Sequence, residues 1–218
     1  NYFDNTFNVD GTLREFPGYY TATVTDAALA WIARQHTQPW FLILGHKAPH
    51  GGPIEPEPRF AHALDEFPVR APVNAGSYAV ADGKPEWLQQ SYPTWHGLGG
   101  PLYGQPDYDS FVRAYLATLL SVDVSVGRIY AALRDAGQLD DTVIVYTSDN
   151  GFALGEHGRV DKRTAYEESM RVPLLVRYPP LVAQGALVDA LVLNLDLAPT
   201  VVDLAGADAL RHIDGRSL

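Results

Sequence analysis

Two residues that carry hard oxygen ligands stand side by side where a buried strand is predicted to end. Asp149 and Asn150 directly follow the apolar run Val143 to Thr147. Ligands in sheets of parallel strands bind beyond the carboxyl ends of the strands, and carboxylate and amide oxygens suit Ca²⁺ or Mg²⁺. The pair therefore predicts a divalent cation site. The string Asp-Asn-Gly is also typical of an ordinary turn, and these residues alone leave both interpretations open.

A glycine-rich loop with a histidine and a lysine comes soon after this pair. It contains Gly155-Glu156-His157-Gly158 and then Lys162. A lysine beside a metal cation is repelled by it unless an anion binds near both positive charges. A metal with a lysine and a histidine nearby is a set that gathers the negative oxygens of a sulfate or phosphate ester. The loop is therefore a candidate anion-binding site.

A second polar cluster follows an earlier apolar run. Trp40 to Leu44 is predicted to be a short strand, and His46, Lys47 and His50 come after it. At a strand end, His50 can donate to an ester oxygen or protonate a leaving group, and Lys47 adds positive charge for the same anion. His46 is interpreted as structural or as a support for the site.

Three arginines near the loop have two interpretations. Arg159, Arg163 and Arg171 can add to the anion pocket. The segment from Tyr166 to Arg171, however, has the pattern of a scaffold in which Arg171 pairs with a carboxylate. We favour the scaffold, because such ion pairs are commoner than ligand contacts.

The apolar runs around the candidate site predict the sheet that positions it. The run Val143 to Thr147 and a second run ending at Tyr178 are too short for helices and too uninterrupted for half-exposed strands. Each therefore predicts the interior of a parallel sheet that is covered on both faces. A further strand is expected from Leu191 to Leu195.

Helical patterns lie between these runs. One helix is expected to begin at an N-cap, Thr25 or Asp26, and a long amphipathic helix runs from Tyr108 to a stop at Gly137. Asp196 is predicted to cap a helix that has a proline in its first turn. The opening segment, residues 1–11, is polar and rich in turn residues. The chain as a whole predicts an α/β fold with a mostly parallel central sheet and helices on both faces.

A long segment rich in proline and glycine, Gly51 to Gly104, shows little periodicity. Such segments inside compact domains tend to be binding loops or lids, so it is expected to shape a substrate entrance, with a plain surface excursion as the alternative. No boundary divides the chain, and residues 1–218 are expected to form one domain.

Composition excludes several classes of protein. The chain has 218 residues, 46% of them hydrophobic, a net charge of −10 and no cysteine. The negative charge argues against a general binder of nucleic acid or of anionic membranes. Without cysteine there is no disulfide, thiolate zinc site or cysteine nucleophile in this sequence. No apolar run approaches the roughly 20 residues that span a bilayer, so neither nucleic acid nor a membrane is an expected partner.

Several strings together resemble the sulfatases of the alkaline phosphatase superfamily, particularly those that act on sulfated sugars and aryl sulfates. The strings, in chain order, are HKAPH (46–50), TSDNGFALGEHG (147–158), DKRTAYEESMRVPLLVRYP (161–179), LNLDLAPTVVDLAG (193–206) and DGRSL (214–218). The resemblance covers nearly the whole chain. It implies a sulfatase-like α/β fold and a sulfuric ester hydrolase, with a periplasmic, secreted or lysosomal location.

The resemblance also implies roles for individual residues. Asp149 and Asn150 match two ligands of the family's calcium ion. Lys162 matches the lysine that binds the sulfate, and His50 matches the histidine that contacts it, so these two are the catalytic candidates. His157 is implied to be a neighbour of the site, and Lys47 joins it as a substrate-binding candidate.

The sequence departs from the family pattern in three places. Two paired aspartates that complete the calcium site, a Cys-or-Ser-x-Pro-x-Arg segment that supplies the formylglycine nucleophile, and a Lys-x-His segment are missing. The chain is therefore expected to match the middle and later part of a sulfatase, with an incomplete sheet that a second copy of the chain covers or that rearranges. Two other functions remain open: a stand-alone, non-catalytic anion-binding remnant, and a phosphodiesterase or phosphonate hydrolase of the same superfamily.

Overall fold

The computed structural model describes residues 1–75, 83–91, 101–208 and 211–218, and these residues divide into two compact units. The first unit comprises Asn1–Val143 and Asn150–Arg171, and the second comprises Ile144–Asp149 and Val172–Leu218. The main elements of the first unit are β1 (Phe3–Val9), β2 (Thr12–Tyr19), α1 (Tyr20–Ile32), α2 (Glu86–Ser91), α3 (Tyr108–Asp135) and α4 (Glu167–Met170). Those of the second are β3 (Ile144–Thr147), β4 (Leu174–Arg177) and α5 (Leu197–Leu204). Short 3-10 turns lie at Pro58–Phe60, Glu156–Gly158 and Asn194–Asp196.

The opening segment, for which no element is predicted, forms an antiparallel hairpin of β1 and β2. Asp10 and Gly11 make its turn, with φ angles of 52° and 84°. Two consecutive positive φ angles match the twist of the flanking strands, and an Asp-Gly pair adopts them readily. The alternating exposure of β1 follows from the hairpin, because successive side chains point to opposite faces.

Helix α1 begins five residues before the predicted cap, at Tyr20, and Tyr19 is its N-cap. The prediction of a start at Thr25 or Asp26 is therefore wrong. Thr25 lies inside the helix, where its hydroxyl donates to the carbonyl of Thr21 at 2.5 Å and contacts Ser125 Oγ at 2.6 Å. These bonds allow polar side chains to occupy the buried face of the helix.

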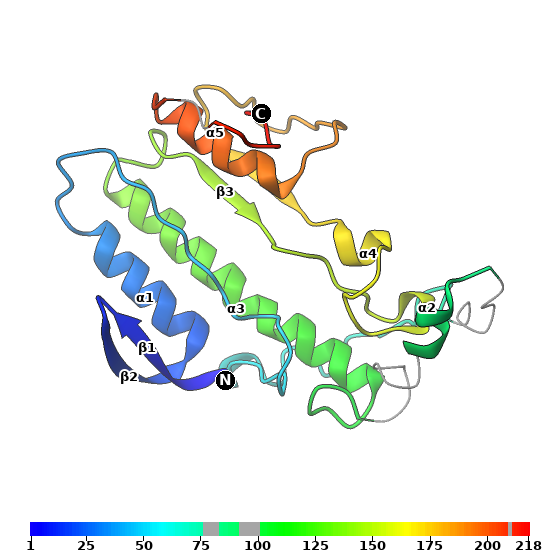
Figure 1. Cartoon of the computed structure of the whole chain (residues 1–218). Coiled ribbons are helices and arrows are strands. Elements are labelled where there is room, and N and C mark those ends of the chain that lie inside the picture. The colour runs from blue at the N-terminus through cyan, green and yellow to red at the C-terminus, as the bar shows by residue number, and fades with distance from the viewer. Residues whose placement is uncertain (76–82, 92–100, 209–210) are drawn as a thin grey trace. The chain divides into compact units, whose positions relative to one another are not determined.

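The long helix α3 confirms the prediction for 108–137, and it runs beside α1 (Figure 1). The side chain of Asp107 caps its start by accepting from Ser110 N at 2.7 Å, and Gly137 follows its end with a φ of 69°. Helix α3 is long and apolar enough, by length and composition only, to cross a membrane, and an 18-residue window of it has a mean hydropathy of 1.4. The core helix of a soluble protein passes the same test. Phe111 and Leu133 of α3 are fully buried within this chain.

The predicted strand Trp40 to Leu44 is wrong, because residues 39–47 have no regular secondary structure. A strand exists only where its backbone pairs with another strand, and no described residue pairs with this run. Its side chains nevertheless alternate as in a strand: Phe41 is 62% exposed and Ile43 is 77% exposed, while Leu42 between them is half-buried.

The second unit contains the two apolar runs that flank the acidic pair. Both predicted strands form, as β3 and β4, but they pair antiparallel with each other, Ile144 with Arg177 and Thr147 with Leu174. Among the described residues, the connection between them carries α4 of four residues and one 3-10 turn rather than the long crossover helix that parallel strands require. The predicted burial is also wrong, since Leu175 is 63% exposed.

The run Leu191 to Leu195 is not a strand either, because it leads into a 3-10 turn at Asn194–Asp196. Asp196 immediately precedes α5 as predicted, but its side chain does not cap that helix. It accepts instead from Leu193 N and Arg216 N, both at 2.9 Å. These two hydrogen bonds lower the pKa of the Asp196 carboxyl group and tie the chain end at 216 to the start of α5.

Candidate anion-binding site

His50 lies at the end of a tight turn, where its backbone N donates to the carbonyl of Lys47 at 2.8 Å. The Tyr2 hydroxyl donates to the His50 carbonyl at 3.0 Å. The ring atom Nδ1 is 2.6 Å from the carbonyl oxygen of Gly51. Because a carbonyl only accepts, Nδ1 carries a proton. The other ring nitrogen, Nε2, has no hydrogen-bond partner in the described part of the chain, so it is the atom that His50 can offer to a ligand.

Lys47 borders a hollow of about 320 Å³. Its ammonium lies 5.3 Å from the centroid of the Tyr2 ring, a distance at which the ring attracts a cation. The lining is completed by Asn1, Phe3, Gly52, Pro53 and Glu55. The carboxylate of Glu55 gives this hollow a mixed charge.

Lys162 is half-buried at the turn that follows a buried carboxylate. That carboxylate, Asp161, is 4% exposed, and it accepts from the Lys162 backbone N and from Arg163 Nη1, both at 2.6 Å. Arg163 therefore compensates the charge of Asp161. The Lys162 ammonium forms no ion pair with any residue in the described ranges, which leaves its charge for a bound anion.

His157 is held by two neighbours from the segment that begins α4. Its ring stacks on Tyr166 with centroids 3.8 Å apart and an angle of 11° between the planes. Its Nε2 lies 3.3 Å from Glu168 Oε2. Lys84, from the 51–104 segment, places its ammonium 5.2 Å from the centroid of the Tyr166 ring. The segment predicted to shape an entrance thus contacts the loop that carries His157.

Tyr103 lies between the two predicted clusters and has no signal in the sequence. A Cβ atom added to Gly51 would lie 2.3 Å from Tyr103 Cδ1, so the ring packs directly on the residue after His50. The same ring is 6.1 Å from that of Phe152, centroid to centroid. Burial and the nearby Asp161 carboxylate raise the pKa of Tyr103 to about 12. The ring therefore lies beside the turn that ends at His50 and beside Phe152, and the next residue, Ala153, donates to the Asp161 carbonyl at 2.9 Å.

Asp149 and Asn150 follow β3 as predicted. The Asp149 carboxylate accepts from Ser148 Oγ at 3.4 Å, and the Asn150 amide donates to the Gly151 carbonyl at 2.7 Å. Ca²⁺ takes about six to eight oxygen ligands. The described residues contain no group of three or more His, Asp or Glu that could hold a metal. The pair fits two ligands of a calcium ion, but the residues described here do not complete the site.

The arginines serve as a scaffold. Arg171 lies 3.7 Å from the carboxylate of Glu167 one helical turn earlier, which confirms its predicted ion pair. Arg159 is buried and donates to the carbonyl of Leu88 at 2.9 Å. Together with the Arg163–Asp161 pair, these contacts hold the loop rather than leave three guanidinium groups for a ligand.

His46 has the structural role predicted for it. Its Nε2 lies 3.3 Å from Ser125 Oγ, and its Nδ1 is buried without a hydrogen-bond partner among the described residues. Burial lowers the pKa of the His46 ring, because desolvation disfavours the charged imidazolium. His46 thus anchors the start of the HKAPH segment to α3 as a neutral side chain.

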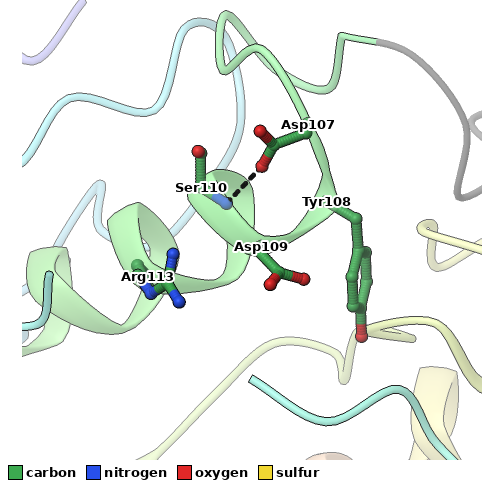
Figure 2. Close-up of a pocket in the computed structure, with 5 residues that line it drawn as sticks. All are labelled: Asp107, Tyr108, Asp109, Ser110 and Arg113. Atoms are coloured by element: carbon green, nitrogen blue, oxygen red, sulfur yellow. Dashed lines mark hydrogen bonds between the residues drawn. The ribbon is translucent and has the colours of Figure 1, made fainter. Parts of the chain in front are cut away.

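A second hollow, of about 360 Å³, lies at the start of α3 (Figure 2). Asp107, Tyr108, Asp109, Ser110 and Arg113 line it, and the Tyr108 hydroxyl also donates to the carbonyl of Leu154. The hydrogen bond from Ser110 N lowers the pKa of Asp107. Two carboxylates against one guanidinium make this hollow unsuited to a sulfate ester.

The family resemblance of the sequence motifs agrees with the comparisons to known proteins. A model of the sulfatase family matches residues 1–207. The chain belongs to the sulfatase family.

Two curated relatives are each 31% identical to it over the aligned residues. An N-acetylglucosamine-6-O-sulfatase of Bacteroides thetaiotaomicron aligns over 100% of this chain and 48% of its own length. The human N-acetylglucosamine-6-sulfatase aligns over 100% of this chain and 39% of its own length. The chain thus spans less than half the length of these relatives.

Two solved structures show the same fold. One, described as a complex with its substrate D-glucosamine-2-N,6-O-disulfate, is 31% identical with a TM-score of 0.84 and is matched over 55% of its chain. A phosphonate monoester hydrolase of Silicibacter pomeroyi is 27% identical with a TM-score of 0.78 and is matched over 45% of its chain. Both comparisons cover 100% of this chain. They confirm the predicted α/β fold class of the alkaline phosphatase superfamily.

Proposed function

We propose that this chain carries the sulfate-binding half of the active site of a sulfuric ester hydrolase that acts on sulfated sugars. The observation that carries the proposal is the half-buried residue Lys162, whose neighbouring carboxylate, Asp161, is already compensated by Arg163. The names of the relatives support a sulfated amino sugar as the substrate class, since two of them are N-acetylglucosamine-6-sulfatases.

The chemistry assigned to this chain is electrostatic. Lys162 binds a sulfate oxygen and stabilises the charge that moves onto the leaving oxygen as the S–O bond breaks. His50, with its Nδ1 proton held by Gly51, presents Nε2 to the same group. Lys47 and His157 line the approach, and the 51–104 segment forms the entrance. Residues 76–82 and 92–100 of that segment lie outside the described residues.

Asp149 and Asn150 are proposed as two ligands of a calcium ion. When bound, such an ion would lower the energy of negative charge on the ester oxygens. No group of three or more His, Asp or Glu among the described residues completes the site.

Substitution of Lys162 in the full-length protein tests the proposal. Lys162→Ala is expected to lower kcat/KM for a 6-sulfated N-acetylglucosamine by about 100-fold or more, as removal of one preorganised donor does. The control is Arg134→Ala, which removes one exposed positive charge that bonds to its neighbour Asp135. Equal activity of Lys162→Ala and the control would overturn the assignment.

Two other functions are outcomes of the same assay. The similarity to a phosphonate monoester hydrolase favours a phosphonate ester as an alternative substrate. Faster turnover of a phosphonate monoester than of the sulfated sugar would establish it. Sulfate binding without turnover of either ester would establish a non-catalytic anion-binding protein.

A further inference from the structure

The 51–104 segment begins and ends at one place, because its two ends pack on each other. Ile54 N donates to the carbonyl of Tyr103 at 2.8 Å, and the Gln105 side chain donates to the carbonyl of Ile54 at 2.8 Å. A Cβ atom added to Gly104 would lie 3.1 Å from Pro53 Cβ. These contacts form a neck, which we define as residues 51–54 and 103–105.

Tyr103 is the side chain of the neck that packs on Gly51, the residue after His50. It has a φ of 49°, a left-handed conformation that bulky residues rarely adopt. Such a conformation persists only where the surroundings hold it. Here its ring packs on Gly51 and stacks on Phe111 of α3 at 5.5 Å, centroid to centroid. A rigid helix therefore backs the ring on the side of the core.

The residues that the ring contacts are linked by hydrogen bonds to the segments that carry His50 and Lys162. Gly51 accepts the Nδ1 proton of His50 through its carbonyl, so a shift of Gly51 moves the imidazole. The ring also meets Phe152 edge-on at 6.1 Å, centroid to centroid, and the next residue, Ala153, donates through its N to the Asp161 carbonyl at 2.9 Å. The Asp161 carboxylate in turn holds the backbone N of Lys162. A displacement of the ring would therefore disturb both His50 and Lys162.

We propose that Tyr103 is a positioning residue that sets the spacing between His50 and Lys162, and that the neck acts on anion affinity through this ring. The inference rests on the proposed function, in which these two residues bind the sulfate. The ring, rather than the hydroxyl, performs the positioning, because the contacts with Gly51, Phe111 and Phe152 are made by ring atoms.

Two pairs of variants of the full-length protein test the proposal, with the inhibition constant of inorganic sulfate, KM, kcat and Tm as readouts. Tyr103→Leu removes the ring, and Tyr115→Leu is its control from the same aromatic cluster, where Tyr115 stacks on Phe152 at 5.8 Å, centroid to centroid. Gly51→Ala pushes on the ring. Its control is Gly45→Ala, since a Cβ atom at Gly45 meets nothing within 4 Å.

We expect Tyr103→Leu and Gly51→Ala to weaken sulfate binding and raise KM by about tenfold, as small misplacements of binding groups do. For both controls, the inhibition constant of sulfate and KM are expected to stay within about twofold of the values of the unaltered protein. Each variant is assayed at the same number of degrees below its own Tm. Tyr103→Phe retains the ring and is expected to restore the affinity of the unaltered protein.

The outcomes separate this inference from the proposed function. If Tyr115→Leu weakens sulfate binding as much as Tyr103→Leu, or if Tyr103→Phe does not restore it, the positioning role is overturned and the hydrolase assignment stands. If the unaltered protein hydrolyses no sulfate ester but its sulfate affinity still depends on the Tyr103 ring, the positioning role stands. Failure of the unaltered protein to bind sulfate overturns both.

Discussion

The guanidinium of Arg159 donates a hydrogen bond of 2.9 Å to the backbone carbonyl of Leu88, and Arg159 is only 4% exposed. This contact joins the loop before Lys162 to the segment that contains α2. Removing one partner of a buried hydrogen bond destabilises the folded protein, because the other partner is left without a hydrogen bond.

Arg159→Met is therefore expected to lower the free energy of unfolding by about 1 to 3 kcal/mol, the range for a hydrogen bond of a charged group. Urea unfolding measures it. The control Arg134→Met, at an exposed side chain, is expected to change stability by less than about 0.5 kcal/mol. Similar values for the two variants would show that the contact with Leu88 contributes little.

The buried ring of His46 predicts a pH dependence of stability. Burial lowers its pKa, so the folded protein binds this proton less readily than the unfolded chain does. Its stabilising contribution is complete above the unfolded pKa of about 6.5 and is lost as the pH falls below that value toward the folded pKa. His46→Gln removes this contribution.

The difference in unfolding free energy between the unaltered protein and His46→Gln should consequently be larger at pH 7.5 than at pH 5.5. The other histidines titrate in both proteins and cancel in the difference. Denaturant unfolding at the two pH values measures it, and a difference that does not vary with pH would contradict the prediction.

Calcium is expected to raise the Tm of the full-length protein, because a ligand that binds the folded state stabilises it. Asp149→Ala should abolish this shift, since it removes one charged oxygen ligand. Asp123→Ala, at an exposed position of α3, should retain it. A calcium shift that survives in Asp149→Ala would place the ion elsewhere.

The exposed side chains of Phe41 and Ile43 predict that the 218-residue chain self-associates. Unpaired, apolar strand-like segments bind other chains. Light scattering over a range of concentrations should show a mass above 23.9 kDa, which falls in the double variant Phe41→Ser, Ile43→Ser. Leu13→Ser is the control, because Leu13 is 72% exposed on β2. A constant monomer mass for the unaltered chain would contradict the prediction.

The sequence predicts elements well where the decisive interactions are local. Helix α3 has its periodicity, its cap and its stop within one continuous stretch, and it forms as predicted. The start of α1 was missed because Thr21 and Thr25 look like surface residues. They are buried, and the partner that accounts for Thr25 is Ser125, far along the chain. The strand predicted for Trp40 to Leu44 does not form, because an apolar pattern becomes a strand only where a neighbouring strand pairs with it.

The candidate site shows the same division. Lys162, His50 and Asp149 could be predicted from the sequence because each stands in a motif of contiguous residues. Tyr103 could not, because the role proposed for it follows from packing on Gly51 and Phe152, and neither contact leaves a local pattern. The antiparallel pairing of β3 with β4 was missed because an apolar run does not encode the direction of its partner.

The backbone at His157 restricts which side chains can ever occupy that position. Its φ of 55° lies in the left-handed region, where glycine, asparagine, aspartate and histidine are tolerated and β-branched residues are not. Among these four, imidazole alone is aromatic and able to carry a positive charge. A redesign of this loop that keeps this backbone conformation, the stack on Tyr166 and the contact with Glu168 is therefore expected to favour histidine at position 157.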